Sequence, residues 1–234
     1  SDKPDLRNPI KIPDVGDLVK GVPFKVFSDQ LERGGVVRGI GIPTKEDVSR
    51  SQFDKWTQIS KDNHAKGIVW IKKDGDTYNS PANKFLDQNV LKALHDKLCP
   101  NGGVAVVVAD DYKNACSALG ALRISVGQQF NLIDTKEDKF CWVIDFPLFE
   151  YDPHGKRWIA CHHPFTAPKD DHVALMGQGD NESLNKAQAK AYDLVCNGYE
   201  IAGGSVRIHN SETQALMFKS LGLSDEEAKE KFGF

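Results

Sequence analysis

Apolar and polar residues follow two different patterns along this chain, and the change comes near residue 134. In the first part, amphipathic stretches alternate with short apolar runs. Phe53, Trp56 and Ile59 recur at three-residue spacing within 49–63, which predicts a helix with one buried face. The almost wholly apolar run 104–109 predicts a strand covered on both faces. The other predicted elements are strands at 24–27, 36–42 and 67–72 and helices at 90–98 and 114–126.

The second part of the chain favours longer, antiparallel strands. A charged run at 134–139 marks the boundary between the parts. Beyond the last strand, Ser224 and Glu227 have the spacing of a helix capping box. The stretch 169–172 predicts a solvated loop, and the polar, glycine-containing stretch 177–185 predicts a mobile one. The predicted elements are strands at 140–150, 157–165, 191–197 and 199–209, a polar turn at 152–156, and helices at 212–221 and 225–231.

The composition is that of a globular protein of one large domain or two ordinary ones. Hydrophobic residues make up 40% and charged residues 27% of the 234 positions, and the net charge is −3. Nucleic-acid binding would therefore need a local basic patch. No apolar run approaches the roughly 20 residues of a membrane span, and the first residues lack a secretory signal. The five cysteines have neither disulfide nor zinc spacing, so we expect free thiols in a reducing cytosol.

Two stretches of the second part carry the residues with chemical potential. Adjacent histidines, His162 and His163, enter a proline-bounded loop, and adjacent strand residues point to opposite faces. Further on, Glu200, two glycines and Arg207 lie along one extended segment. Taken alone, the residues of that segment favour an ordinary strand with a glycine bulge and a surface arginine. A bulge could bring Glu200 and Arg207, seven positions apart, to one face. A metal site of both histidines and a carboxylate is a further alternative, although the spacing is unusual.

These stretches, 145–168 and 197–209, resemble the catalytic domain of bacterial-type aspartyl-tRNA synthetases, a class II family. The resemblance covers essentially the whole chain. It implies an α+β fold, in which a partial class II synthetase-like antiparallel sheet carries an inserted α/β GAD domain. The implied parts are a connection from the catalytic core at 1–8, the GAD-like insertion at 9–138 and a partial catalytic domain at 139–234. Similar phrases also occur in family order at Ser1-Asp-Lys-Pro-Asp-Leu-Arg7, Gly67-Ile-Val-Trp-Ile71, Ser80-Pro-Ala-Asn-Lys-Phe85 and Ala118-Leu-Gly-Ala-Leu-Arg123.

The resemblance implies an aspartate–tRNA ligase, which uses ATP to activate L-aspartate to aspartyl-adenylate and then charges tRNA(Asp). His162 and Arg207 match family residues that bind aspartate, and a planar guanidinium suits a carboxylate. Glu200 matches the family glutamate at the ATP site, where a carboxylate can hold Mg²⁺ against phosphates. Ala202 replaces the first of three glycines in the usual family pattern. No catalytic residue beyond these ligand-binding positions is implied.

Large parts of a complete family member do not occur in this sequence. The anticodon-binding barrel and class II motifs 1, 2 and 3 are missing, so we expect a fragment that is inactive alone. The implied parent is a cytoplasmic homodimer with no membrane partner. One rival hypothesis is a non-catalytic tRNA-interacting GAD-domain module. Another is a metal-dependent hydrolase that uses the histidine pair.

Overall fold

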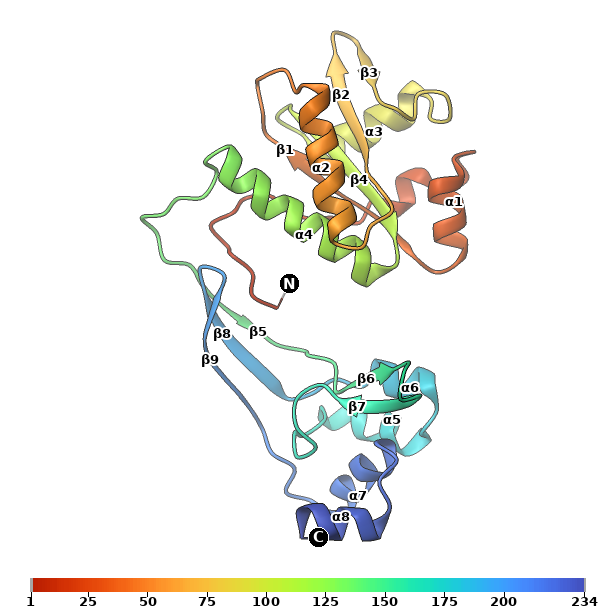
Figure 1. The fold of residues 1–234 in the computed structure, drawn as a ribbon, viewed down its shortest axis with the longest axis vertical. Helices are drawn as coiled ribbons and strands as arrows, with labels where there is room; N and C mark the ends of the chain where they lie inside the picture. The colour runs from red at the N-terminus through yellow and green to blue at the C-terminus, as the bar shows by residue number, and fades with distance from the viewer. Residues whose placement is uncertain (1, 234) are drawn as a thin grey trace. The chain divides into compact units, whose positions relative to one another are not determined.

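The computed structural model describes residues 2–233, which form two compact units. The first unit is Arg7–Glu137. The second unit combines the short segment Asp2–Leu6 with the chain from residue 138 onward. Both contain helices and antiparallel sheets, which confirms the predicted α+β class (Figure 1). No helix within residues 2–233 is long and apolar enough to cross a membrane.

The first unit is built on a four-stranded antiparallel sheet in the order β1-β4-β2-β3. A short 3-10 helix, η1, precedes the sheet, and four α-helices pack on it. The strands are β1 (Val36–Ile42), β2 (Val69–Asp74), β3 (Thr77–Asn79) and β4 (Val104–Asp110), and the helices are η1 (Gly16–Val19), α1 (Lys25–Glu32), α2 (Arg50–Asp62), α3 (Gln88–Leu98) and α4 (Tyr112–Gln129).

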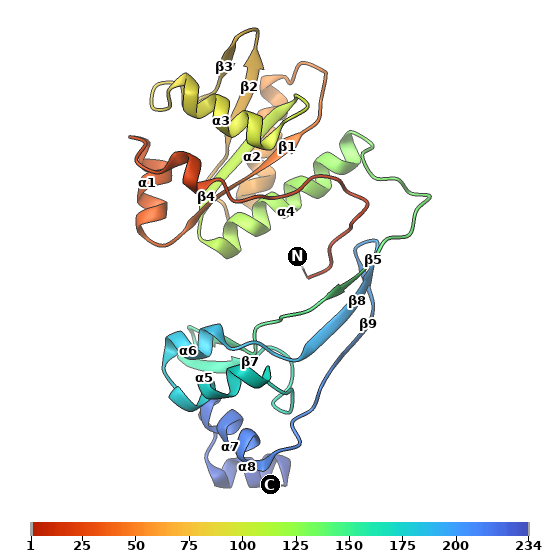
Figure 2. The same cartoon turned by 180° about the vertical axis from the view of Figure 1, so that it is seen from behind.

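Helices cover both faces of this sheet, so the unit has two apolar cores (Figures 1 and 2). Alternate residues of the central strand β4 divide between them: Val106 packs with α2 and α4, and Val107 packs with α1 and α3. All its residues except Ala109 are buried, which confirms the predicted strand covered on both faces. The helices predicted at 49–63, 90–98 and 114–126 are confirmed within a few residues.

Two glycines of β1 let helix α3 approach the sheet closely. A Cβ on Gly41 would lie 1.8 Å from the Leu98 carbonyl oxygen, and one on Gly39 would lie 2.6 Å from Leu98 Cδ1. Any side chain at these positions would therefore push the end of α3 off the sheet.

The strand predicted at 24–27 is wrong, because this stretch begins helix α1. Phe27 and Gln30 are buried at helical spacing, whereas Val26, which precedes Phe27, is 52% exposed. Four residues are too few to separate a period of 3.6 from a period of 2. Strand β3 was not predicted, since its three residues carry little pattern of their own.

The second unit contains a three-stranded antiparallel sheet, β5-β8-β9, and a separate hairpin, β6-β7. Short helices pack beside them around a core that includes Leu148, Phe149, Met176 and Met217. The strands are β5 (Phe140–Val143), β6 (Phe149–Asp152), β7 (Arg157–Ala160), β8 (Ala191–Cys196) and β9 (Tyr199–Ser205), and the helices are η2 (Asp170–His172), α5 (Val173–Gln178), α6 (Asn181–Lys186), α7 (Ser211–Ser220) and α8 (Asp225–Phe232).

Three predicted strands of this unit are shorter than expected. The stretch 140–150 is two strands, since Asp145 adopts a left-handed φ of 63° between them. Strand 157–165 ends at Ala160, before the loop that Pro164 interrupts. Strand 199–209 ends at Ser205, and Arg207 then makes an isolated bridge with Thr166.

The loops predicted at 169–172 and 177–185 are wrong, because these stretches contain η2, the end of α5 and most of α6. Met176 and Leu184 anchor α5 and α6 in the core, at 2% and 3% exposure. Asp180 caps α6 by accepting a hydrogen bond of 2.9 Å from the Ser183 backbone N–H. The predicted turn at 152–156 and the capping box of Ser224 and Glu227 are confirmed.

Candidate functional site

The β8–β9 hairpin carries the candidate residues on a strand with one irregularity. Asp193 pairs with Gly203, and Leu194 pairs with Ala202. The register then shifts, so that Val195 pairs with Glu200 and Ile201 is the extra residue of a β-bulge. The bulge reverses the alternation, and Glu200 joins Gly203 on the same face of the sheet. A bulge at the glycines was one alternative for this segment, and the structure has a bulge just before them, at Ile201.

The carboxylates of Asp193 and Glu200 both lie close to the position that a Cβ on Gly203 would occupy. A Cβ at this glycine would lie 2.6 Å from Asp193 Oδ1 and 3.1 Å from Glu200 Oε1. Real Cβ atoms do not come so close to oxygen, so this glycine leaves the room in which both acids meet. The neighbouring Gly204 and Ala202 belong to the opposite face, where Gly204 lies against the Tyr192 ring. The methyl group of Ala202 therefore points away from the carboxylate pair.

The electrostatics of the pair centre on Asp193. Partial burial raises the pKa of Asp193, and the negative charge of Glu200 raises it further. The His162 imidazole acts in the opposite direction and lowers the pKa of Asp193. On the other side, the Lys3 ammonium lies 3.4 Å from Glu200 Oε2. Asp2 also raises the pKa of Asp193 and Lys3 lowers it, so the acids Glu200 and Asp2 and the basic groups His162 and Lys3 all act on Asp193.

The two histidines have different surroundings. The His162 ring lies edge-on to Phe146, with 4.9 Å between the ring centroids. It is near enough to Asp193 to lower the pKa of that carboxyl group. His163 Nδ1 accepts a hydrogen bond of 3.1 Å from the Phe165 backbone N–H, and its ring contacts Phe165. His163 therefore stabilises the turn of its own loop, and only His162 belongs to the candidate site.

Arg207 lies beyond the end of β9, beside the loop that follows His162. Its backbone bridges Thr166, which is 1% exposed, and the Thr166 hydroxyl lies 3.4 Å from the Ser205 hydroxyl. The residue alternation from Gly203 through Ser205 gives Arg207 the same side of the strand. The side chain is exposed and forms no ion pair with any residue from 2 to 233.

Asp193 was not predicted as a site residue from the sequence. A signal was present, because Asp193 is the single charged residue in the otherwise apolar strand 191–196. A half-buried carboxylate in such a strand requires a partner, and its partner became visible only through the β8–β9 register.

The comparisons with known proteins match the chain over its full length. The family model described as tRNA synthetases class II (D, K and N) matches residues 1–234. The chain belongs to this family. It is 43% identical over 235 residues to an aspartate–tRNA(Asp/Asn) ligase of Caldanaerobacter subterraneus, and 41% identical over 236 residues to an aspartate–tRNA ligase of Staphylococcus carnosus. These alignments cover the whole of this chain and only 39% and 40% of the two relatives. The chain thus spans about two fifths of the length of the curated relatives it matches.

For a class II synthetase, the donor set at Gly203 suits Mg²⁺. This ion is usually held by one or two carboxylates together with waters and substrate phosphates. Asp193 and Glu200 supply such a pair. Among residues 2–233, no group of three or more histidines, cysteines or acids could hold a metal ion by itself. The histidine-pair metal site therefore finds no support in the described part of the chain.

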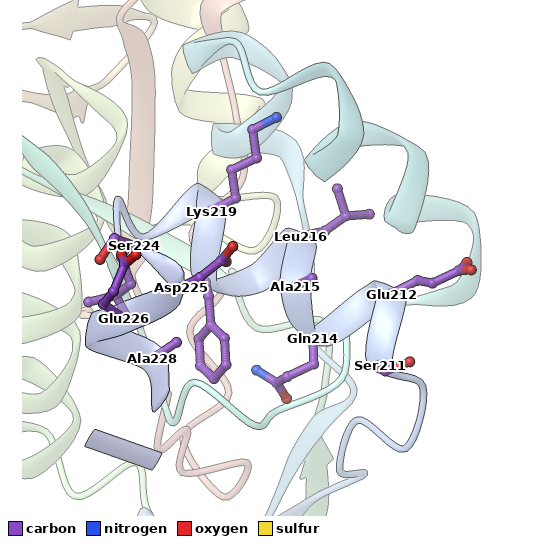
Figure 3. Close-up of a pocket in the computed structure, with 12 residues that line it drawn as sticks. Ser211, Glu212, Gln214, Ala215, Leu216, Lys219, Ser224, Asp225, Glu226 and Ala228 are labelled. Atoms are coloured by element: carbon purple, nitrogen blue, oxygen red, sulfur yellow. The ribbon is translucent and has the colours of Figure 1, made fainter. Parts of the chain in front are cut away.

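A groove lies elsewhere in the second unit, between α7 and α8. Its volume is about 990 Å³. Figure 3 shows Leu216 and Ala215 on one side of it and Ala228 on the other. None of the candidate residues lines it. Its lining includes the acids Glu212, Asp225 and Glu226, but it contains neither His162 nor Arg207, so the candidate site stays on the hairpin face.

Proposed function

We propose that this chain is part of an aspartate–tRNA ligase, which activates L-aspartate with ATP and transfers the aspartyl group to tRNA(Asp). The observation that carries the proposal is the pair of Asp193 and Glu200 on one face of a hairpin, with His162 near Asp193 and Arg207 on the extension of β9. An anion-binding residue and a cation-binding pair lie on one hairpin and its extension, which suits a reaction between an amino acid and a triphosphate.

In this proposal Arg207 recognises the side-chain carboxylate of aspartate. A guanidinium binds a carboxylate through two parallel hydrogen bonds, whereas the amide of asparagine leaves the charge only partly satisfied. His162 hydrogen-bonds the same substrate from the neighbouring loop. Its ring is held edge-on by Phe146, so the imidazole has a preferred orientation.

In the same proposal Asp193 and Glu200 hold Mg²⁺ beside the phosphates of ATP. The bound ion would offset the negative charge that develops on the departing pyrophosphate. The two carboxylates would position the ion, and Gly203 leaves space for both of them. Asp193 is the addition to the residues that the sequence predicted.

The domain assignment follows from the same proposal. Residues 9–138 correspond to a GAD-like insertion, residues 1–8 to its connection from the catalytic core, and residues 139–234 to part of the class II catalytic domain. The relatives are about two and a half times as long as this chain, and the remaining parts of the core would come from the rest of the parent ligase. We further propose that the parent acts as a cytoplasmic homodimer.

The experiment that tests this function is a charging assay with the parent ligase, labelled amino acids and transcripts of tRNA(Asp) and tRNA(Asn). The proposal predicts that aspartate, and not asparagine, is attached to tRNA(Asp) in an ATP-dependent reaction. The tRNA(Asn) lane then reports whether the parent serves one tRNA or both. Binding of tRNA without charging by any amino acid would contradict the proposal and favour a tRNA-interacting module.

A further inference from the structure

The segment Asp2–Leu6 lies against the β8–β9 hairpin, although residues 7–190 separate the two in sequence. Its Lys3 ammonium lies 3.4 Å from Glu200 Oε2. At the hairpin turn, a Cβ on Gly198 would lie 3.5 Å from Asp5 Cβ and 3.9 Å from the Lys3 carbonyl oxygen. Two independent contacts therefore join the segment to the hairpin that bears the carboxylate pair.

The two oxygens of Glu200 have different neighbours. Oε2 contacts Lys3, whereas Oε1 lies near Gly203, on the side of Asp193 Oδ1. Without a positive charge nearby, the carboxylates of Asp193 and Glu200 would repel each other. Lys3 offsets part of that repulsion from the outer side of Glu200 and leaves the inner oxygen turned towards Asp193.

We propose that Lys3 is the exchangeable counter-ion of the Asp193–Glu200 pair, which holds Glu200 until a divalent cation displaces the ammonium. The inference rests on the proposed function, because the cation and the phosphates belong to the ligase reaction. Once displaced, the ammonium stays beside the cation and offers its three donors to a phosphate group. Lys3 thereby weakens the binding of the cation alone and strengthens the binding of a cation together with a nucleotide.

The expected size of this competition follows from Coulomb's law. A unit charge about 5 Å from a divalent cation in a water-exposed site changes the affinity for that cation roughly tenfold. Salt screens the effect, so it is largest at low ionic strength. Both side chains are partly exposed, at 48% for Lys3 and 39% for Glu200, which justifies the high dielectric constant.

The test measures Mn²⁺ binding to the 234-residue chain by electron paramagnetic resonance, in low salt and without ATP. Lys3→Met is expected to bind Mn²⁺ roughly 5- to 20-fold more tightly than the wild type. Lys3→Arg, which keeps the charge, stays near the wild type. Lys219→Met is the matched control, because Lys219 is exposed on α7 of the same unit and lies outside the carboxylate cluster. Equal Mn²⁺ affinity of the wild type and Lys3→Met overturns the inference.

A second readout separates this role from a purely structural ion pair. In EDTA, Lys3→Met is expected to unfold at lower urea concentration than the wild type, and saturating Mn²⁺ is expected to abolish the difference. A structural pair would give the same difference with and without Mn²⁺, which contradicts the inference. Absence of Mn²⁺ binding by every variant also overturns it, and charging by the parent ligase then judges the proposed function separately.

Discussion

Gly203 leaves space for the carboxylate pair, because a Cβ at this position would lie 2.6 Å from Asp193 Oδ1 and 3.1 Å from Glu200 Oε1, and both side chains would have to shift. The sequence revealed the glycines, Glu200 and Arg207, but the importance of Asp193 depends on strand register. Register is set by pairing between segments distant in sequence, and a one-residue bulge changes which side chains share a face. The difference in role between His162 and His163 follows in the same way from their neighbours, Phe146 and Phe165.

Replacement of Arg207 tests the aspartate contact. Arg207→Ala in the parent ligase is expected to lower kcat/KM for aspartate by about 30- to several thousand-fold, because a charge-assisted contact to a desolvated carboxylate contributes roughly 2–5 kcal/mol. Steady-state kinetics of aspartate activation measure the loss. Arg157→Ala is the control, since Arg157 is an exposed arginine on β7. Unchanged kinetics in a folded Arg207→Ala variant would reject the assignment.

Replacement of Asp193 tests the electrostatics of the pair. The pKa of Asp193 is raised in the folded chain above its ordinary value of 3.8, so this group favours folding most below that pH. Its contribution is lost as the pH rises through the folded-state pKa, and at neutral pH the charge opposes folding. Asp193→Asn is therefore expected to gain stability relative to the wild type as the pH rises from 3 to 7.

Urea unfolding of both proteins across this pH range, without divalent cations, measures the difference. Asp76→Asn provides a carboxyl-to-amide control in the exposed turn between β2 and β3. A stability difference between Asp193→Asn and the wild type that does not change with pH would contradict the electrostatic account.

At the scale of elements, strong periodicity was reliable and short or polar stretches were not. The helices around Trp56 and Leu94 and the apolar strand β4 were predicted, because each carries a full pattern of buried positions. Helix α1 was taken for a strand because its first turn shows only four residues of pattern. Helices α5 and α6 were missed because one or two buried side chains anchor each of them within polar sequence.

Two glycine substitutions test how the first unit packs. Gly41→Ala is expected to destabilise the chain by about 1–3 kcal/mol, because the new methyl group would overlap the Leu98 carbonyl of α3. Gly120→Ala is the matched substitution on α4, where nothing lies within 4 Å of the added Cβ. It is expected to stabilise the helix by about 0.5–1 kcal/mol. Urea unfolding measures both, and equal effects of the two changes would contradict the packing of α3 on β1.

At the scale of the whole molecule, the two units have separate cores and different degrees of coverage. The first unit covers its sheet with helices on both faces. In the second unit, one face of β5-β8-β9 exposes large apolar side chains, including Phe140, Trp142 and Tyr192. Exposed apolar patches of this kind mark interaction surfaces. We expect the rest of the parent ligase core to cover this face. The two-part organisation was predictable from the change of pattern, whereas the exposed face could be recognised only from the strand pairing.

The first unit is expected to fold by itself. Residues 7–137 contain both layers of helices and both of its apolar cores, so a chain of these residues alone is expected to unfold in one cooperative transition. Circular dichroism during urea titration measures this transition. A gradual, non-cooperative loss of helix signal would show that the unit depends on the remainder of the chain.

The central claim is that this chain carries part of the active site of an aspartate-activating ligase. Aspartate-dependent exchange of labelled pyrophosphate into ATP tests it most directly, with the 234-residue chain and its parent measured side by side. We expect exchange by the parent, loss of that exchange in the Glu200→Gln parent, and none by the 234-residue chain, which spans about two fifths of its relatives' length. Absence of exchange in the parent would contradict the ligase assignment.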